Sequence, residues 1–399
     1  MRIAVDFHDE RLDFEVADDR LVGHRGGPVG PPAPDPSTAT RAAIDGPRGF
    51  PPLARAVVPG DRVVIPFDPE TPDPAAILGA VAEVLRAAEV ESITVVSTGP
   101  APAGTPEGLT WTVHDPDDRA QLAYLATTQE GHRVYLNKLL IDADIVVPIG
   151  ALGYDPALGY RGPWSVIYPG QSDREMQSRY RAAAASAEAP PDRDRPGPLL
   201  LESSEVSWLL GCQFHLGVVP GVSGTASVVA GLESAVRAHG AAAVDEAWTF
   251  RVAERADVVI AGIGAPGRPT SIDDLANGLD AAGRLVRRGG KVVALSRARG
   301  EPGPAFRRII AAGEPRVAVK VLRGHEADPD FLAARRIAAT LAWADVYLHS
   351  ALDPDLVDDL GMIPLDRPEE ARKLAAAAAS CTLIGQADRT RVLVDGEGD

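Results

Sequence analysis

The sequence predicts an open α/β fold with two domains, and three observations lead to this prediction. Short apolar strands alternate with helical segments, as in strand 62–67, helix 74–88 and strand 92–97, and such βαβ units form parallel sheets. The same alternation begins again at residue 256. The chain has 399 residues, whereas one domain has roughly 150. We therefore expect two open α/β domains with parallel-type sheets.

The N-terminal segment predicts a small addition to this fold. Residues 2–22 alternate apolar and polar side chains, which is typical of a β-hairpin, and Asp9-Glu10 lies near its turn. Residues 23–52 are rich in Gly and Pro and show little periodicity, so we expect a long connection there.

The domain boundary is expected near residue 250. Strands at 110–113 and 143–149 continue the first α/β series. Residues 181–198, rich in Ala, Pro and charged side chains, predict a mobile segment. This gives an N-terminal domain of residues 1–250 and a C-terminal domain of residues 251–399. In the latter we expect strands at 256–261, 291–295, 317–322 and 345–348, and helices at 272–287, 329–342 and 368–379.

Composition excludes several classes of partner. Forty basic against 56 acidic residues give a net charge of −16, which argues against nucleic acid and against an anionic membrane surface. No apolar run reaches the ~18 residues of a membrane span, and no secretory signal is visible. Two cysteines form no disulfide framework, and no histidine pair has metal-ligand spacing. We expect a cytoplasmic protein with a small-molecule ligand and no histidine-based metal site.

A glycine-rich motif follows the strand at 256–261. Gly262-Ile-Gly-Ala-Pro-Gly267 has the GxGxxG pattern with which backbone amides approach a dinucleotide pyrophosphate. Pro266 and Pro269 interrupt the turn, which favours an ordinary strand-to-helix connection. Ser271 and Asp274 instead have the spacing of a helix N-cap and its acidic partner.

Residues 153–175 hold the densest cluster of polar and aromatic candidates. The cluster follows a strand that ends at Ile149, and ligands of open α/β sheets bind beyond the carboxyl ends of strands. Arg161, Trp164 and Arg174 have the chemistry to present guanidinium groups and an aromatic wall to a carboxylate. A surface crossover rich in turns is the alternative.

Four segments in order resemble the nickel-pincer-dependent lactate racemase family: 59–68, 95–99, 137–175, and 273–279 with 289–293. The resemblance implies two α/β domains with the active site in the cleft between them. It also implies interconversion of 2-hydroxy acid stereoisomers by hydride transfer through a nickel-pincer nucleotide, with paired histidines as acid and base.

Most functional positions of the family carry different residues in this chain. The lysine that tethers the cofactor corresponds to Ser165, and the nickel-ligating histidine to Arg181. The catalytic histidines correspond to Ala101 and Asp155. Asp68 is retained, although the arginine expected three residues later is Thr71. The resemblance thus leaves Asp68 and Asp155 as catalytic candidates and Gly99, Ser165 and Gly170 as cofactor-binding candidates.

The substrate-holding positions have also changed. The family's glutamine and lysine correspond to Asp274 and Asn277, which with Arg161, Trp164 and Arg174 are the substrate-binding candidates. A carboxylate of the protein in place of a cation repels the carboxylate of a simple 2-hydroxy acid, and this contact weakens binding by on the order of a few kcal/mol. The sequence therefore favours a polyhydroxylated ligand.

Three functions follow from the sequence, in order of preference. The first is a divergent 2-hydroxy acid or sugar-acid racemase or epimerase with altered or lost nickel-pincer anchoring. The second is a non-catalytic small-molecule-binding or regulatory protein that kept the fold, because function resides in sites and not in folds. The third is an NAD(P)-dependent oxidoreductase that uses the Gly262 loop.

Overall fold

The computed structural model describes residues 1–30, 35–155, 159–186, 196–313 and 318–395. The chain divides into two compact units. The inserted unit comprises Gly30–Ala247, and the discontinuous unit comprises Met1–Val29 with Trp248–Asp399. The mixed α/β fold with parallel sheets confirms the predicted fold class. The observed division near residue 248 lies close to the predicted 250, but residues 1–29 go with the C-terminal part of the chain.

The inserted unit is built on a largely parallel sheet. Its strand order is β14-β13-β10-β4-β5-β6, with β9 also paired to β4. Only the β13–β14 pair is antiparallel among the described pairs of this sheet. The strands are β4 (Arg62–Phe67), β5 (Ser92–Ser97), β6 (Thr110–Val113), β9 (Ile145–Val146), β10 (Ile149–Ala151), β13 (His215–Pro220) and β14 (Thr225–Gly231).

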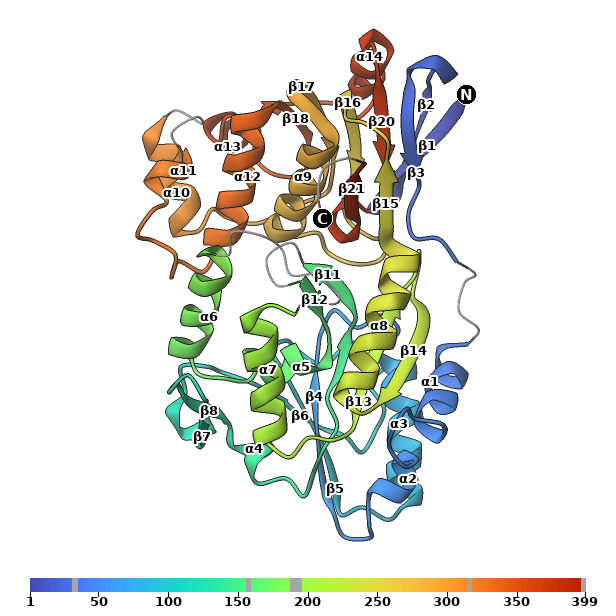
Figure 1. Cartoon of the computed structure of the whole chain (residues 1–399), viewed down its shortest axis with the longest axis vertical. Coiled ribbons are helices and arrows are strands. Elements are labelled where there is room, and N and C mark those ends of the chain that lie inside the picture. Colours follow the sequence, from blue (N-terminus) through green and yellow to red (C-terminus); the bar gives the residue numbers. More distant parts are fainter. Residues whose placement is uncertain (31–34, 156–158, 187–195, 314–317, 396–399) are drawn as a thin grey trace. The chain divides into compact units, whose positions relative to one another are not determined.

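Helices and two short hairpins complete the inserted unit (Figure 1). The apolar side of α3 packs into the same core as β4, β5 and β10, which explains its helical spacing of Ile77, Val81 and Leu85. The helices are α1 (Pro36–Asp45), α2 (Leu53–Ala56), α3 (Pro74–Ala87), α4 (Lys138–Ile141), α5 (Pro163–Ile167), α6 (Arg174–Ser186), α7 (Pro198–Leu209) and α8 (Glu233–Trp248). The hairpins are β7 (Leu122–Thr127) with β8 (Arg133–Asn137), and β11 (Gly153–Asp155) with β12 (Gly159–Arg161).

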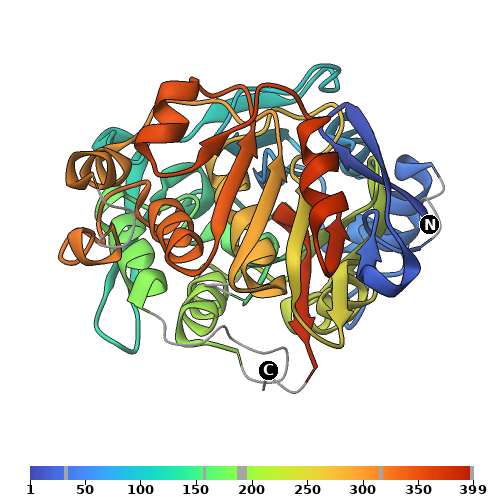
Figure 2. The same cartoon turned by 90° about the horizontal axis from the view of Figure 1, so that it is seen from above.

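The discontinuous unit has a parallel sheet of strand order β19-β18-β17-β16-β20-β3. Figure 2 shows its strands side by side in yellow, orange and red, with the blue N-terminal hairpin near the red helix α14. The strands are β3 (Leu21–Arg25), β16 (Ala256–Gly262), β17 (Val286–Leu295), β18 (Asp345–His349), β19 (Ile363–Pro364) and β20 (Cys381–Ile384). A separate parallel pair joins β15 (Thr249–Val252) to β21 (Arg391–Val394). The helices are α9 (Ile272–Leu285), α10 (Pro304–Ala312), α11 (Ala318–Val321), α12 (Phe331–Trp343), α13 (Pro354–Asp359) and α14 (Glu370–Ala377).

The predicted N-terminal hairpin is confirmed as β1 (Arg2–Phe7) and β2 (Glu10–Glu15). Its apolar face, including Val5 and Phe14, packs in one core with Ile260 of β16. The strand β3 then pairs in parallel with β20. Residues 1–29 therefore belong with the C-terminal part, because their hydrogen bonds and apolar contacts are made there.

Two local predictions were wrong. Residues 23–52 were expected to be a connection, but they contain part of β3, and helix α1, which Asp35 caps by accepting a hydrogen bond from the Thr38 amide at 2.8 Å. The segment 317–322 was expected to be a strand, but Ala318–Val321 form the helix α11. Such a short apolar run does not distinguish strand from helix by its pattern.

The predicted mobile segment 181–198 falls partly outside the described residues, at 187–195. Its first residues belong to α6 and its last residue begins α7. None of the helices in the described part of the chain is long and apolar enough to cross a membrane.

Candidate functional site

The candidate site lies where three neighbouring parallel strands of the inserted unit end. Phe67, the last residue of β4, pairs with Ser97 of β5 and with Ile149 of β10. The residues that follow, Asp68 and Thr98, therefore leave the sheet at the same level. This edge is where open parallel sheets bind their ligands, as the sequence analysis expected.

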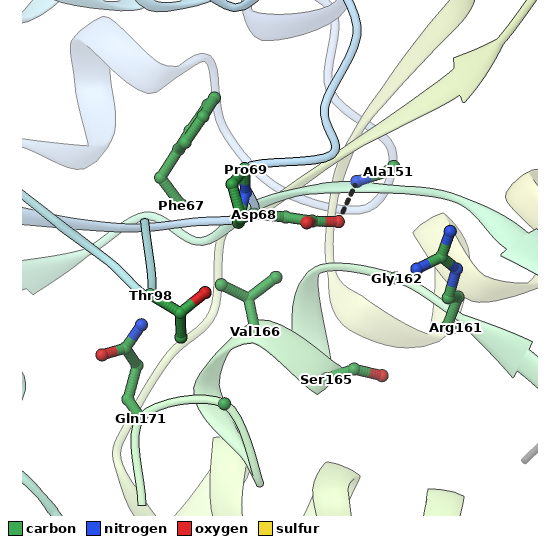
Figure 3. A pocket seen from close by; sticks show the side chains of 11 residues that line it. Phe67, Asp68, Pro69, Thr98, Ala151, Arg161, Gly162, Ser165, Val166 and Gln171 are labelled. Atoms are coloured by element: carbon green, nitrogen blue, oxygen red, sulfur yellow. Dashed lines mark hydrogen bonds between the residues drawn. The ribbon is translucent and has the colours of Figure 1, made fainter. Parts of the chain in front are cut away.

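A pocket of about 180 Å³ opens at this edge. Figure 3 shows Asp68 extending toward Ala151, with Arg161 and Ser165 on one side and Thr98 and Gln171 on the other. The described residues that line it are Phe67, Asp68, Pro69, Thr98, Ala151, Arg161, Gly162, Ser165, Val166, Gly170 and Gln171.

The Asp68 carboxylate is held by two backbone amides. Its Oδ1 accepts a hydrogen bond from the Glu70 amide at 2.9 Å, and its Oδ2 accepts one from the Ala151 amide at 3.1 Å. Burial, and then the charge of Glu70, raise the pKa of Asp68 above its ordinary value, and Arg161 opposes them. Asp68 is thus a fixed carboxylate with a raised pKa, which suits a group that exchanges protons.

Arg161, from β12, is shared among several carboxylates. Its Nη2 donates to Oε2 of Glu70 at 2.8 Å. Glu70 above all, with Asp68 and Asp155, raises the pKa of this guanidinium. Arg161 therefore stays charged, and much of its charge is compensated within the protein.

Glycines allow the backbone to pack closely around the pocket. A Cβ atom on Gly150 would lie 2.8 Å from Cγ2 of Val166, so this glycine lets α5 approach the end of β10. A Cβ atom on Gly170 would lie 2.4 Å from the Val166 carbonyl oxygen. Gly170 is therefore required where the chain returns past the end of α5.

Gln171 brings a buried amide to the pocket wall. Its side chain is fully buried, and its Nε2 lies 3.4 Å from the Val96 carbonyl oxygen. Its Oε1 atom is buried without a hydrogen-bond partner in the described structure. An unpaired buried acceptor is costly, so this atom is suited to a donor group of a ligand.

A neutral histidine supports the same segment. His114 is buried, which lowers its pKa, and its Nδ1 lies 3.2 Å from Nδ2 of Asn137. Because the asparagine amide nitrogen only donates, Nδ1 accepts, and Nε2 donates to the Ser172 carbonyl at 2.9 Å. These two bonds give His114 a structural role.

The structure places two predicted binding residues of this region away from the pocket. Trp164 is fully buried, so its ring forms no aromatic wall of the pocket. The ring packs against Gly162, where a Cβ atom would lie only 2.7 Å from it. Arg174, at the start of α6, forms an exposed ion pair with Asp117 at 2.8 Å. Of the three predicted here, Arg161 alone lines the pocket.

The remaining candidates of the inserted unit divide in the same way. Asp68, Ser165 and Gly170 line the pocket. Asp155, at the end of β11, and Gly99, which follows Thr98, are not among the lining residues. Asp155 nevertheless acts on Arg161 through its charge.

Asp274 and Asn277 lie on α9 of the discontinuous unit. Asp274 closes the predicted helix cap: it accepts from the Ser271 amide at 2.8 Å, while Ser271 Oγ accepts from the Asp274 amide at 3.1 Å. It also pairs with Arg268 at 2.6 Å. The side-chain oxygen of Asn277 accepts from Arg336. Both predicted substrate-binding residues have structural partners here.

The amides of the Gly262–Gly267 loop are already used. The Gly264 amide donates to the Asp388 carboxylate at 2.9 Å, and the Gly267 amide donates to Asp9 at 3.0 Å. Carboxylates at these positions repel a pyrophosphate. The structure therefore favours the strand-to-helix connection over a dinucleotide site.

The pocket does not fit a covalently tethered nickel cofactor. Its lining, all within the described residues, contains no lysine, histidine or cysteine. Ser165 occupies the tether position, Arg181 lies on α6 with its Nη2 bonded to Ser178 Oγ at 3.1 Å, and Ala101 is exposed. Across the described part of the chain, no group of three His, Cys, Asp or Glu side chains is arranged to hold a metal ion.

Sequence reasoning missed the lining residues Thr98 and Gln171, and it also missed Glu70, the ion-pair partner of Arg161. Thr98 directly follows the predicted strand 92–97. Because ligands of open α/β sheets bind beyond the carboxyl ends of strands, this position could have been predicted from the sequence. Gln171 and Glu70 carry no such signal, because their positions depend on how the loops fold back.

Fold and site together define an α/β protein with a ligand pocket at the carboxyl ends of parallel strands. The family model of the lactate racemase N-terminal domain matches residues 7–186. This part of the chain is therefore similar to the N-terminal domain of lactate racemases.

Solved structures share the fold of the chain. The lactate racemase apoprotein from Thermoanaerobacterium thermosaccharolyticum matches with a TM-score of 0.82 and 19% identity, over 98% of this chain and 100% of that one. A protein from Thermotoga maritima matches with a TM-score of 0.69 and 13% identity, over 91% and 99%. At these identities the similarity establishes the fold. No curated protein sequence matches the chain.

Proposed function

We propose that this lactate-racemase-like protein is a racemase or epimerase of a hydroxylated small molecule bound at the Asp68 pocket. One observation carries the proposal: Asp68 lines the pocket at the end of β4, is fixed by the amides of Glu70 and Ala151, and has a raised pKa. A carboxylate with these properties is a candidate general base.

The chemistry that the pocket residues supply by themselves is proton transfer. Asp68 takes the proton from a substrate carbon next to a carbonyl group, and the electron pair of the broken C–H bond forms the C=C bond of an enediolate. Arg161 offers N–H groups to the enediolate oxygen, and Ser165 and Thr98 offer hydroxyls to the substrate. A proton from solvent then adds to the opposite face of the carbon, and Asp68 releases its proton. The step needs no oxidant or reductant.

This route differs from the hydride transfer that the family resemblance implies. Hydride transfer through a nickel-pincer nucleotide requires a lysine tether, a nickel ligand and an imidazole pair. The described residues of the pocket lining offer none of these groups, so we assign no step to that cofactor. Altered or lost anchoring is part of the proposal.

Deuterium incorporation tests the proposal. Purified protein is incubated in D₂O with a panel of aldoses, ketoses and sugar acids, and exchange at the carbon next to the carbonyl is followed by NMR. We expect exchange with inversion for one member of the panel, and its loss in Asp68→Asn. Inversion without deuterium incorporation contradicts proton transfer and points to hydride transfer.

A non-catalytic binding protein is the second candidate, and one observation favours it. Among the described residues that line the pocket, Asp68 is the only one with a side-chain carboxylate, imidazole, thiol or ammonium group, so none of them places a second such acid opposite it. A ligand that raises the melting temperature but never exchanges deuterium supports binding alone.

A further inference from the structure

The charges around the pocket restrict the ligand. Three carboxylates, those of Glu70, Asp68 and Asp155, act on the single guanidinium of Arg161. The cation that acts on Asp68 is this same Arg161. The positive charge of Arg161 is therefore already compensated by carboxylates of the protein, and the remaining negative charge disfavours binding of an anionic ligand.

The hydrogen-bonding groups point the same way. The Oε1 atom of fully buried Gln171 lacks a partner in the described structure, and the Asp68 carboxylate only accepts when charged. These acceptors are satisfied by hydroxyl or ammonium donors. A carboxylate group on the ligand offers neither kind of donor.

We propose, on the basis of the proposed function, that the substrate is an uncharged or aminated sugar and not a sugar acid or a 2-hydroxy acid. This departs from the acid expected from the family resemblance. It agrees with the proton-transfer step, because moving a proton from the substrate to Asp68 leaves the total charge of the occupied pocket unchanged. A bound carboxylate, by contrast, adds a negative charge from the start.

Matched ligand sets test this inference. Each set contains a hexose, its 2-amino derivative and the corresponding aldonate, such as glucose, glucosamine and gluconate, and binding to the full chain is measured by calorimetry. We expect one hexose or amino sugar to bind at least about tenfold more tightly than its aldonate.

Charge variants localise the effect. Glu70→Gln is expected to reduce the preference over the aldonate by on the order of tenfold, and Asp155→Asn to reduce it by less. The matched control is Glu83→Gln, because Glu83 is an exposed residue of α3 that pairs with Arg41 outside the pocket. This control is expected to keep the preference.

The outcomes separate the inference from the proposed function. Tighter binding of an aldonate, or an unchanged preference in both Glu70→Gln and Asp155→Asn, overturns the inference and leaves the pocket as a binding site. Binding by no member of any set overturns both. A preference that falls in Glu70→Gln and Asp155→Asn and not in the control supports the inference.

Discussion

The Oδ2 atom of Asp68 lies 3.1 Å from the backbone nitrogen of Ala151, so one side chain joins the ends of β4 and β10. The same carboxylate accepts the Glu70 amide through Oδ1 at 2.9 Å. Both contacts fix the carboxylate before any ligand arrives, and preorganised groups are the ones that contribute most to catalysis.

Asp68→Asn is expected to abolish deuterium exchange, with a loss of roughly 100-fold or more. The NH₂ group of an asparagine would face one of the two backbone N–H groups, and two donors form no hydrogen bond. We therefore also expect a loss of about 1–3 kcal/mol in the free energy of unfolding. Asp117→Asn, which alters an exposed carboxylate paired with Arg174, is the control. Exchange at the unaltered rate in Asp68→Asn contradicts the assignment.

The pH dependence of exchange follows from the raised pKa of Asp68. The base form is the carboxylate, so the exchange rate rises with pH, and its midpoint lies above the ordinary aspartate pKa of about 3.9. Because the charge of Glu70 helps to raise this pKa, Glu70→Gln is expected to move the midpoint to lower pH. A pH–rate profile of both proteins measures the shift, and a midpoint that moves upward refutes it.

Arg174→Gln is expected to leave ligand affinity unchanged, because Arg174 does not line the pocket. Its exposed ion pair with Asp117 contributes at most about 1 kcal/mol to stability. Titration of the variant with glucose, glucosamine and gluconate measures the affinity. A loss of tenfold or more would restore the binding role that the sequence suggested.

Gly170→Ala and Gly79→Ala are expected to have opposite effects within the inserted unit. At Gly170 the added methyl group would lie 2.4 Å from a carbonyl oxygen, and we expect a loss of about 1–3 kcal/mol. At Gly79, inside α3, the nearest atom is Cγ of Pro106 at 3.8 Å, and alanine is expected to add about 0.5–1 kcal/mol. Denaturant unfolding of both variants gives the comparison, and equal effects would argue against the close packing described.

His215 is expected to make the protein less stable in acid. It is fully buried with Nε2 2.9 Å from Ser207 Oγ, and burial lowers its pKa from 6.5 to about 3. Between these values the unfolded chain binds a proton that the folded chain does not. The stabilisation is therefore complete above pH 6.5 and decreases as the pH falls toward 3, by about 2 kcal/mol between pH 8 and pH 5.

The variant His215→Gln isolates this contribution. Its free energy of unfolding is expected to fall less steeply between pH 8 and pH 5, by about the same 2 kcal/mol. His239→Gln is the control, because His239 is exposed on α8. Equal pH slopes in the wild type and His215→Gln would show that His215 also titrates in the folded state.

Local patterns in the sequence predicted the parts of the fold that depend on neighbouring residues. The cap formed by Ser271 and Asp274 was predicted correctly, because both partners lie within one helical turn. Asp68, by contrast, became a candidate only through the family resemblance, which implies that this residue is retained. The hairpin at the N-terminus followed from strict alternation of side chains.

Features that depend on distant contacts were not predictable in this way. Trp164 was expected at the ligand, but its side chain is fully buried. Gly162 has no side chain, and this leaves space for the Trp164 ring in the interior. Arg174 was expected to bind substrate, but Asp117, more than fifty residues earlier, pairs with it. The charges that compensate Arg161 come from separate loops, and no spacing rule connects them.

The pairing of β3 with β20 has a consequence for how the chain folds during synthesis. Leu21 pairs with Cys381, which is made 360 residues later. The inserted unit, Gly30–Ala247, is continuous and has all its own strands once residue 247 has been made. The N-terminal strand must wait for its neighbour until nearly the whole chain has emerged. We therefore expect the contacts of high sequence separation in the discontinuous unit to form last, as the slow phase of refolding.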